Sequence, residues 1–262
     1  HFSEQVLYQH QRIYGSAEVE LLQNTLNISR MALSKMAISN SLFLNVNHTK
    51  RAGMMALQIL DGVLHHRGVV DPPLFFNLIL ATLISHVGIV GGILEEDEVK
   101  PNQPAEKYYT GKGEYKSFVG PSSNSVLWPH YIERSLLFVD RNFRSLKNLN
   151  IEDVKSAIKF SDISSKSTAK EQTNFCHYVR SAHILAYMTQ SQYNQWLVRL
   201  YRSLEEANLL DHLGFDHLGE FRENYSQHFW ETFYSDLTHL IPLLRETEEG
   251  KMLLATLYSR MS

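Results

Sequence analysis

The sequence predicts an all-α protein built as a single bundle of about eight to ten helices. In most segments apolar residues recur every three or four positions, which is the period of a helix with one buried face. Nowhere do apolar and polar residues alternate as they do in a half-buried strand. Residues 78–92 (LILATLISHVGIVGG) are almost wholly apolar until a run of glycines, and a helix that is apolar on all sides is buried.

Helical periodicity begins at residues 17–38, which predict one or two amphipathic helices. Residues 48–64 predict the next helix and place His48, Ala52 and Ile59 on one face, so His48 should point toward the core. The other segments with helical periodicity are the central helix from residue 71 to residue 92, and then 129–143, 151–160, 174–188, 193–208, 221–245 and 246–260.

Local signals fix two helix boundaries. His65, His66 and then Gly68 are typical of an exposed helix C-terminus, because cations favour the last turn and glycine favours the position after it. Asp71 followed by Pro72 is typical of a helix start, with the aspartate as the capping residue.

Residues 95–128 interrupt the helical pattern with a charged stretch rich in Pro, Gly and Ser. We expect a long polar loop within one domain that covers residues 1–262, since loops of this length are usually functional lids or disordered. The acidic residues 95–98 at its start are expected to form a solvated face.

Composition limits the class of protein. The 262 residues carry a net charge of −3, which argues against nucleic-acid binding. The single cysteine, Cys176, forms no internal disulfide, which favours a reducing compartment. The amino-terminal residues lack the apolar core of a signal peptide, and the apolar run is shorter than the roughly 20 residues of a membrane span. We expect a cytoplasmic protein without a membrane partner, and its oligomeric state stays open.

Three histidines lie on apolar faces of three predicted helices: His48, His86 and His183. A buried imidazole needs a hydrogen bond, a charge or a metal ion, and each of these residues alone is compatible with an ordinary core position. Together they can converge as a ligand set, because helical bundles build metal sites from facing helices and imidazole suits zinc, iron, copper and nickel.

Five blocks of the sequence carry a resemblance to a known superfamily. They are residues 42–60 (LFLNVNHTKRAGMMALQIL), 66–92, 129–143, 179–207 and 229–258. On these blocks the chain resembles the HD-domain superfamily of metal-dependent phosphohydrolases, in particular cyanobacterial HD-domain proteins of unassigned substrate. The superfamily's first four blocks commonly read Y-H-N-V-E-H-T, A-L-x-H-D-I-G-Y, P-Y-H-V-D-R and V-R-A-A-D. The resemblance implies an HD-type helical fold with metal ligands at His48 and His86.

The chain departs from these motifs at the residues that carry the chemistry. Val87 stands where the superfamily has the aspartate that bridges two metals, and His183 replaces the other ligand aspartate. Leu44 stands at the position of a histidine that acts as a general acid in cyclic nucleotide phosphodiesterases. In the third block His130 and Tyr131 exchange the usual order of tyrosine and histidine. Without carboxylates, a set of three histidines favours one transition-metal ion over two hard cations.

Three functions remain open at this point. The first is a divergent HD-domain protein that binds a small molecule or a protein and is not a conventional phosphohydrolase. The second is an enzyme with one metal on His48, His86 and His183, hydrolytic or oxidative, with His130 and Tyr131 as candidates for proton transfer. The third is a phosphohydrolase that takes substitute ligands from other carboxylates. These carboxylates are Glu133, Asp162 and residues 95–98.

Some other residues have structural explanations. Trp128, Trp196 and Trp230 lie in apolar helical patterns, which predict core or interhelix packing for all three. Cys176 shares a predicted face with His183, and a buried inert thiol is favoured over a ligand. Arg134 and Arg180 flank the candidate site, where an anion contact and a surface ion pair explain them equally well.

Overall fold

The computed structural model describes residues 2–99, 105–119, 122–147, 149–163 and 172–261. These residues are predominantly helical and include one small two-stranded sheet, which confirms the all-α prediction. The helices are α1 (Phe2–Tyr14), α2 (Val19–Met36), α3 (Val46–Arg67), α4 (Pro72–Ile84), η1 (Val87–Ile89), η2 (Asn124–His130), α5 (Tyr131–Asn142), α6 (Ile151–Phe160), α7 (Asn174–Met188), α8 (Tyr193–Glu206), α9 (Leu210–Leu213), α10 (Leu218–Thr232), α11 (Tyr234–Leu237), α12 (Ile241–Leu244) and α13 (Glu248–Met261).

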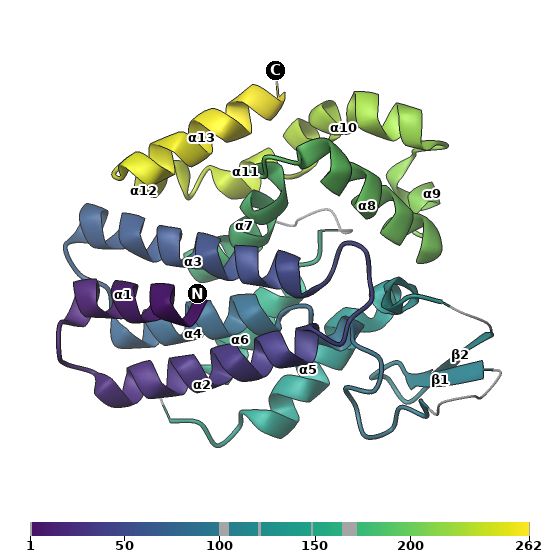
Figure 1. Ribbon diagram of the computed structural model, residues 1–262, viewed down its shortest axis with the longest axis horizontal. Coiled ribbons are helices and arrows are strands. Elements are labelled where there is room, and N and C mark those ends of the chain that lie inside the picture. The colour runs from purple at the N-terminus through teal and green to yellow at the C-terminus, as the bar shows by residue number, and fades with distance from the viewer. Residues whose placement is uncertain (1, 100–104, 120–121, 148, 164–171, 262) are drawn as a thin grey trace.

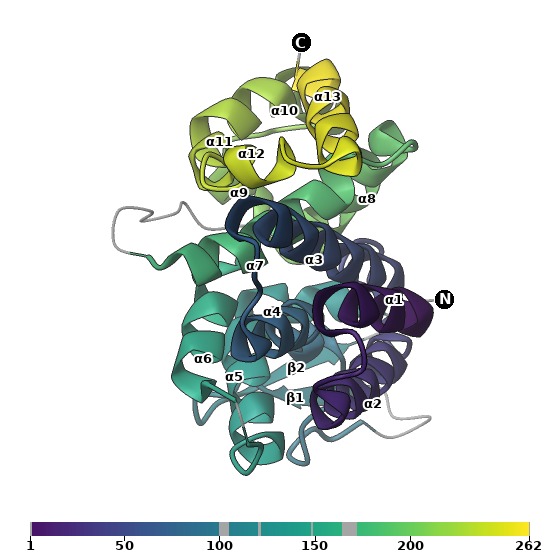
Figure 2. The same ribbon diagram turned by 90° about the vertical axis from the view of Figure 1, so that its left-hand side faces the viewer.

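Helix α3 lies at the centre of the molecule and packs against α7, α4 and α1 (Figure 1). Helices α10 to α13 lie above α3 and α7 in this view, whereas α2, α5 and the small sheet lie below. The view turned by 90° shows α4 enclosed between α1, α2, α3 and α6 (Figure 2). The two helices that touch the most other elements are α3 and α7, and these two helices carry His48 and His183.

The ends of α3 follow from its sequence. The side chain of Asn45 accepts hydrogen bonds from the backbone N–H groups of Asn47 and His48, at 3.0 and 3.3 Å, which caps the first turn. Gly68 follows the last turn with φ of +75°, a conformation that glycine adopts without strain. His65 and His66 lie exposed in the last turn, as predicted.

Helix α4 is the apolar core helix. Every residue from Phe75 to Ile84 is buried. Pro72 lies at its start, as predicted, but Asp71 makes no side-chain capping hydrogen bond, so the predicted cap is absent. The window Pro72–Ile89 is long and apolar enough to cross a membrane, and 83% of it is buried inside the molecule, as in the core helix of a globular protein.

The predicted polar loop at residues 95–128 contains regular structure. Strands β1 (Ala105–Tyr109) and β2 (Tyr115–Val119) pair antiparallel, and η2 follows them. Gly111 and Gly113 in the connecting turn have φ of +90° and +85°, which other residues rarely adopt. The prediction of a structureless loop was wrong because strands of five residues rich in Lys and Tyr carry too short a pattern to distinguish them from a polar loop.

Other expectations also needed correction. Helix α1 forms at the amino terminus, where no helix was predicted. The stretch predicted as one helix at residues 221–245 divides among α10, α11 and α12, with Pro242 in the first turn of α12. Trp128 and Trp196 are buried in the core, whereas Trp230 is 37% exposed and packs between helices, with its ring 6.4 Å from that of Tyr258 on α13. Without the four-residue helices α9, α11 and α12, ten α-helices remain in the described residues, within the predicted range.

Candidate metal centre

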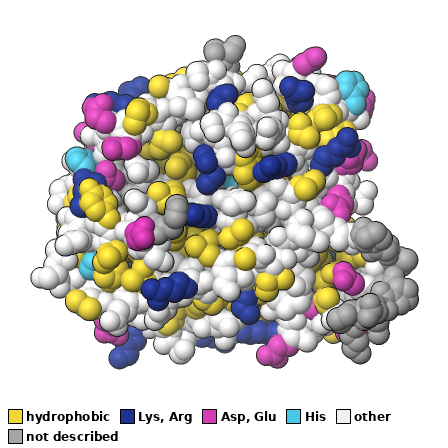
Figure 3. Space-filling view, in the orientation of Figure 1, with side chains coloured by type: hydrophobic (Ala, Val, Ile, Leu, Met, Phe, Trp, Pro, Cys, Tyr) yellow, Lys and Arg dark blue, Asp and Glu magenta, His cyan; other side chains and the backbone are white. Residues whose placement is uncertain are grey.

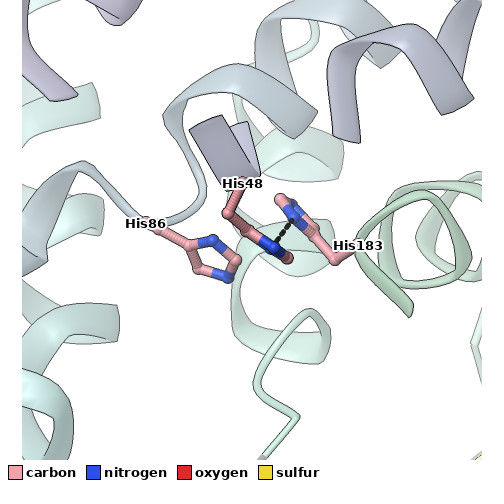
Figure 4. Close-up of side chains that lie close together, drawn as sticks. All are labelled: His48, His86 and His183. Atoms are coloured by element: carbon pink, nitrogen blue, oxygen red, sulfur yellow. Dashed lines mark hydrogen bonds between the residues drawn. The ribbon is translucent and has the colours of Figure 1, made fainter. Parts of the chain in front are cut away.

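Three histidines from three distant parts of the chain meet inside the protein. The ligand atoms of His48, His86 and His183 all lie within 4.8 Å of one another. His48 lies in the first turn of α3, His86 lies between α4 and η1, and His183 lies in the middle of α7 (Figure 4). The side chains point toward one another and are at most 1% exposed. This buried triad can hold one metal ion.

The shortest distance within the triad is compatible with two ligands of one ion. Nδ1 of His183 and Nε2 of His48 are 3.4 Å apart and share a hydrogen bond whose donor depends on the tautomer. Two nitrogens on a tetrahedral ion with bonds of about 2.1 Å are also about 3.4 Å apart. The rings of His86 and His183 are 4.1 Å apart between centroids, and a ligand nitrogen of His86 lies within 4.8 Å of those of the other two histidines.

Aromatic side chains hold His48 in place. The ring of Phe43 lies 5.0 Å from the His48 ring, and the ring of Trp196 lies 6.2 Å away. Asn45 fixes the backbone at the same point, since its side chain caps the helix at His48. His48 therefore enters the core at a rigid position at the start of α3.

His86 is positioned by a short segment fastened to α5. Gly88 donates its backbone N–H to Oγ of Ser135 at 2.8 Å, and this hydroxyl donates to the Ser85 carbonyl at 2.9 Å. Nε of Arg134 donates to the Gly88 carbonyl at 2.6 Å. These bonds on both sides of His86 fix the direction in which its ring points.

The attachment of this segment to α5 also involves a buried ion pair. Two guanidinium nitrogens of Arg134 each donate to one oxygen of Asp97 at 2.8 Å, and both side chains are 0% exposed. Arg134 also donates to the carbonyls of Val90 and Tyr109, so it joins η1 to β1. Asp97 was expected in a solvated acidic face, and Arg134 at the surface or on an anion; both lie in this internal pair instead.

Gly88 has no room for a side chain. A Cβ at this position would lie 2.1 Å from the Tyr131 carbonyl oxygen and 2.6 Å from the backbone nitrogen of Ser135. We expect Gly88→Ala to lower the free energy of unfolding by about 2–3 kcal/mol, because backbone on both segments must move apart. Chemical denaturation measures this loss of stability. Gly92→Ala is the control, because a Cβ at Gly92 has open space but the backbone has a φ of +77°. It therefore reports backbone strain without a steric clash. A Gly88→Ala protein as stable as the wild type would contradict the close approach.

Burial keeps all three imidazoles neutral. It lowers the pKa of His86 and of His183 well below 6.5, with a further contribution from the neighbouring histidines. Burial and the charge of Arg51 lower the pKa of His48 to about 3. A neutral imidazole has a free lone pair, so the triad has the protonation state that a metal requires.

Several nitrogens of the triad have no hydrogen-bond partner. They are Nδ1 of His48, both ring nitrogens of His86 and Nε2 of His183. Buried polar atoms without protein partners are costly and rare, so a cluster of lone-pair-bearing nitrogens is compatible with a bound metal ion. The residues of the triad therefore suit a bound metal ion.

Tyr131 lies beside the triad. Its ring is 5.3 Å from that of His86, and its hydroxyl donates to Oδ1 of Asp162 at 3.3 Å. Burial and the charge of Asp162 raise its pKa well above 10, so the hydroxyl keeps its proton. His130 is half-buried before α5, and after burial the largest cause of its lowered pKa is Lys116 of β2, which places it toward the hairpin.

The remaining candidates have structural partners. Arg180 is buried and donates from Nε to Asp236 at 2.7 Å, so the expectation of a surface ion pair or an anion contact was wrong. Glu133 pairs with Lys112 at 3.0 Å. Cys176 is buried, and its Sγ accepts a hydrogen bond from Thr173 at the start of α7. The residues missed by sequence reasoning are Asp97 and Arg51, whose roles depend on long-range contacts that no local pattern encodes.

The fold and the triad define an all-helical protein with a candidate three-histidine metal centre. The sequence matches the model of the Npun_R2479-like family over residues 1–262, and the chain belongs to that family. No curated protein and no solved structure matches the chain.

Proposed function

We propose that the protein is a divergent member of the HD-domain superfamily that binds one transition-metal ion on His48, His86 and His183. The unpartnered nitrogens of the buried triad carry this proposal. Three imidazoles without a carboxylate suit zinc, iron, copper or nickel better than magnesium or manganese.

A single ion is favoured over a pair. Among the described residues the triad is the one group of His, Cys, Asp and Glu with ligand spacing, and it contains no carboxylate. The position from which the superfamily's aspartate bridges two ions carries Val87, a fully buried hydrocarbon side chain that cannot coordinate a metal. Conventional phosphohydrolase chemistry, which uses two metals, is therefore disfavoured.

The protein's own residues would prepare such a centre for catalysis. A single bound ion with open coordination positions lowers the pKa of a bound water and polarises a substrate oxygen. The Tyr131 hydroxyl, protonated and hydrogen-bonded to Asp162, is a candidate proton donor beside His86. The aromatic side chains Phe43, Trp128 and Trp196 exclude water from the triad.

A binding module without catalysis is the second candidate function. It is favoured because Leu44 stands at the position of the general-acid histidine of cyclic nucleotide phosphodiesterases. The complete burial of the triad, which leaves little access for a substrate, favours it as well. The metal content separates this candidate from an enzyme only in part, because a structural ion is also compatible with a binding module.

Elemental analysis of the purified protein tests the metal centre. We expect close to one zinc, iron, copper or nickel ion per chain, and loss of this ion in His183→Ala, because two imidazoles bind far more weakly than three. His177→Ala is the matched control, since His177 is a buried histidine on the same helix that lies outside the triad. Circular dichroism of each variant reports whether the helices remain folded.

Two results would contradict the proposal. Two ions per chain, especially manganese or magnesium, would revive the phosphohydrolase with substitute carboxylates. A wild-type protein without bound metal, after incubation with each candidate ion, would leave the triad as a packed core and favour the binding module.

A further inference from the structure

Two arginines without carboxylate partners lie next to the triad. Within the described part of the chain, no carboxylate lies at ion-pair distance from Arg51 or Arg199. By contrast, Arg134, Arg141 and Arg180 each pair with an acid. Guanidinium groups that are half-buried and lack an anion are a feature of anion-binding sites.

Arg51 lies one helical turn after His48, on the same side of α3. Its Nε donates to the carbonyl of Ala186 at 3.2 Å, and Ala186 lies one turn after His183 on α7. The guanidinium therefore lies one turn along the same α3–α7 interface on which His48 and His183 meet. It is half-buried, and its charge acts on His48.

Arg199 approaches from α8. Its guanidinium carbon lies 5.2 Å from the centre of the Trp196 ring, and that ring lies 6.2 Å from the His48 ring. The stacking fixes a half-buried cation on the same side chain that covers the triad. In the space-filling view, Lys and Arg side chains gather over α3 and α8 on this face of the molecule (Figure 3).

We propose that Arg51 and Arg199 together bind one anionic group, a carboxylate or a phosphate, of a small-molecule ligand and hold that ligand beside the triad. This inference rests on the proposed metal centre, since it names the class of ligand that the centre receives. Arg51 comes from α3 and Arg199 from α8, so an anion bound by both side chains would be held in one orientation.

A structural role for Arg51 is the competing explanation, because cations often bind the last carbonyls of a helix. Arg260 offers a matched control for this structural role. Its Nη2 donates to the Gln190 carbonyl at the same end of α7, at 3.1 Å, but its guanidinium lies over Tyr193. No ring contact joins Tyr193 to the triad among the described residues.

Anion titrations of the cobalt-substituted protein test the inference. Cobalt(II) replaces the transition metal and gives a visible absorption spectrum that changes when an anion binds at or beside the ion. We expect phosphate or acetate to change the spectrum of the wild type. We expect Arg51→Gln and Arg199→Gln to raise the dissociation constant about tenfold each, and Arg260→Gln to leave it unchanged. Tighter binding of phosphate than of acetate assigns a phosphate group to the ligand, and the opposite order assigns a carboxylate.

The outcomes separate this inference from the metal proposal. Equal dissociation constants in all four proteins would overturn the anion site while leaving the metal centre intact. If no cobalt binds, the metal proposal fails, and thermal unfolding of the metal-free protein then decides. A melting temperature that phosphate raises in the wild type but not in Arg51→Gln or Arg199→Gln supports the anion site alone, and an equal response overturns it.

Discussion

Replacing Arg134 by methionine is expected to lower the free energy of unfolding by about 3–5 kcal/mol, because it leaves the Asp97 carboxylate buried without its cation. The same change removes the bonds from the guanidinium to the carbonyls of Gly88 and Val90. The segment that carries His86 then keeps only its hydrogen bonds to Ser135 of α5. We therefore expect a weaker metal affinity together with the lower stability, measured by urea denaturation and by metal competition with a chelator.

Arg141→Met is the control on the same helix. Arg141 pairs with Glu96 through two hydrogen bonds, but the two side chains are 38% and 29% exposed. Exposed pairs contribute at most about 1 kcal/mol, so this change should have a small effect on stability and none on metal affinity. Similar losses in both variants would mean that burial does not distinguish the two ion pairs.

Acidification is expected to destabilise the metal-free protein strongly through the triad. The pKa of His48 is lowered from 6.5 to about 3 in the folded chain, so the unfolded chain binds its proton first as the pH falls. Stability from this histidine is complete above pH 6.5. It declines by roughly 2–3 kcal/mol between pH 6.5 and pH 4.5. His86 and His183 shift in the same direction and add to the loss.

Denaturation in the presence of a chelator at pH 6.5 and 4.5 measures this effect, and His48→Leu should reduce the difference between the two values. The lower limit of pH 4.5 keeps one other group out of the comparison. Arg141 lowers the pKa of Glu96 to about 2, and the stability from that carboxylate is lost only as the pH falls below about 4.5. A wild type equally stable at both pH values would show that the imidazoles are already charged or exposed.

Sequence patterns predicted the helices of His48 and His183 and the burial of all three histidines, but the helix predicted to carry His86 ends at Ile84, before that residue. His48 was assigned to an inward face by the spacing of its neighbours on α3, and His86 by the apolar residues around it. Both signals are local, because the period of a helix decides which residues share a face. Whether the three side chains meet could be seen only in the structure, because no local sequence pattern determines how distant segments pack together.

The surroundings of the triad were less predictable for the same reason. Asp97 is one of four consecutive acidic residues, and nothing in that run distinguishes the one whose carboxylate lies against Arg134. The hairpin at residues 105–119 was missed because its strands are short and polar, yet Tyr109 of β1 accepts a hydrogen bond from Arg134. Whether the fold is of the HD type stays a prediction from the resemblance of the sequence blocks.

The separation of the triad along the chain has a consequence for biosynthesis. His48 and His183 are 135 residues apart, so their contact cannot form until α7 has emerged from the ribosome. The contacts that orient His86 span only residues 85 to 135 and can form earlier, on the nascent chain. An ion that needs all three imidazoles would therefore enter a nearly complete polypeptide, and its acquisition would be a late event in the maturation of this protein.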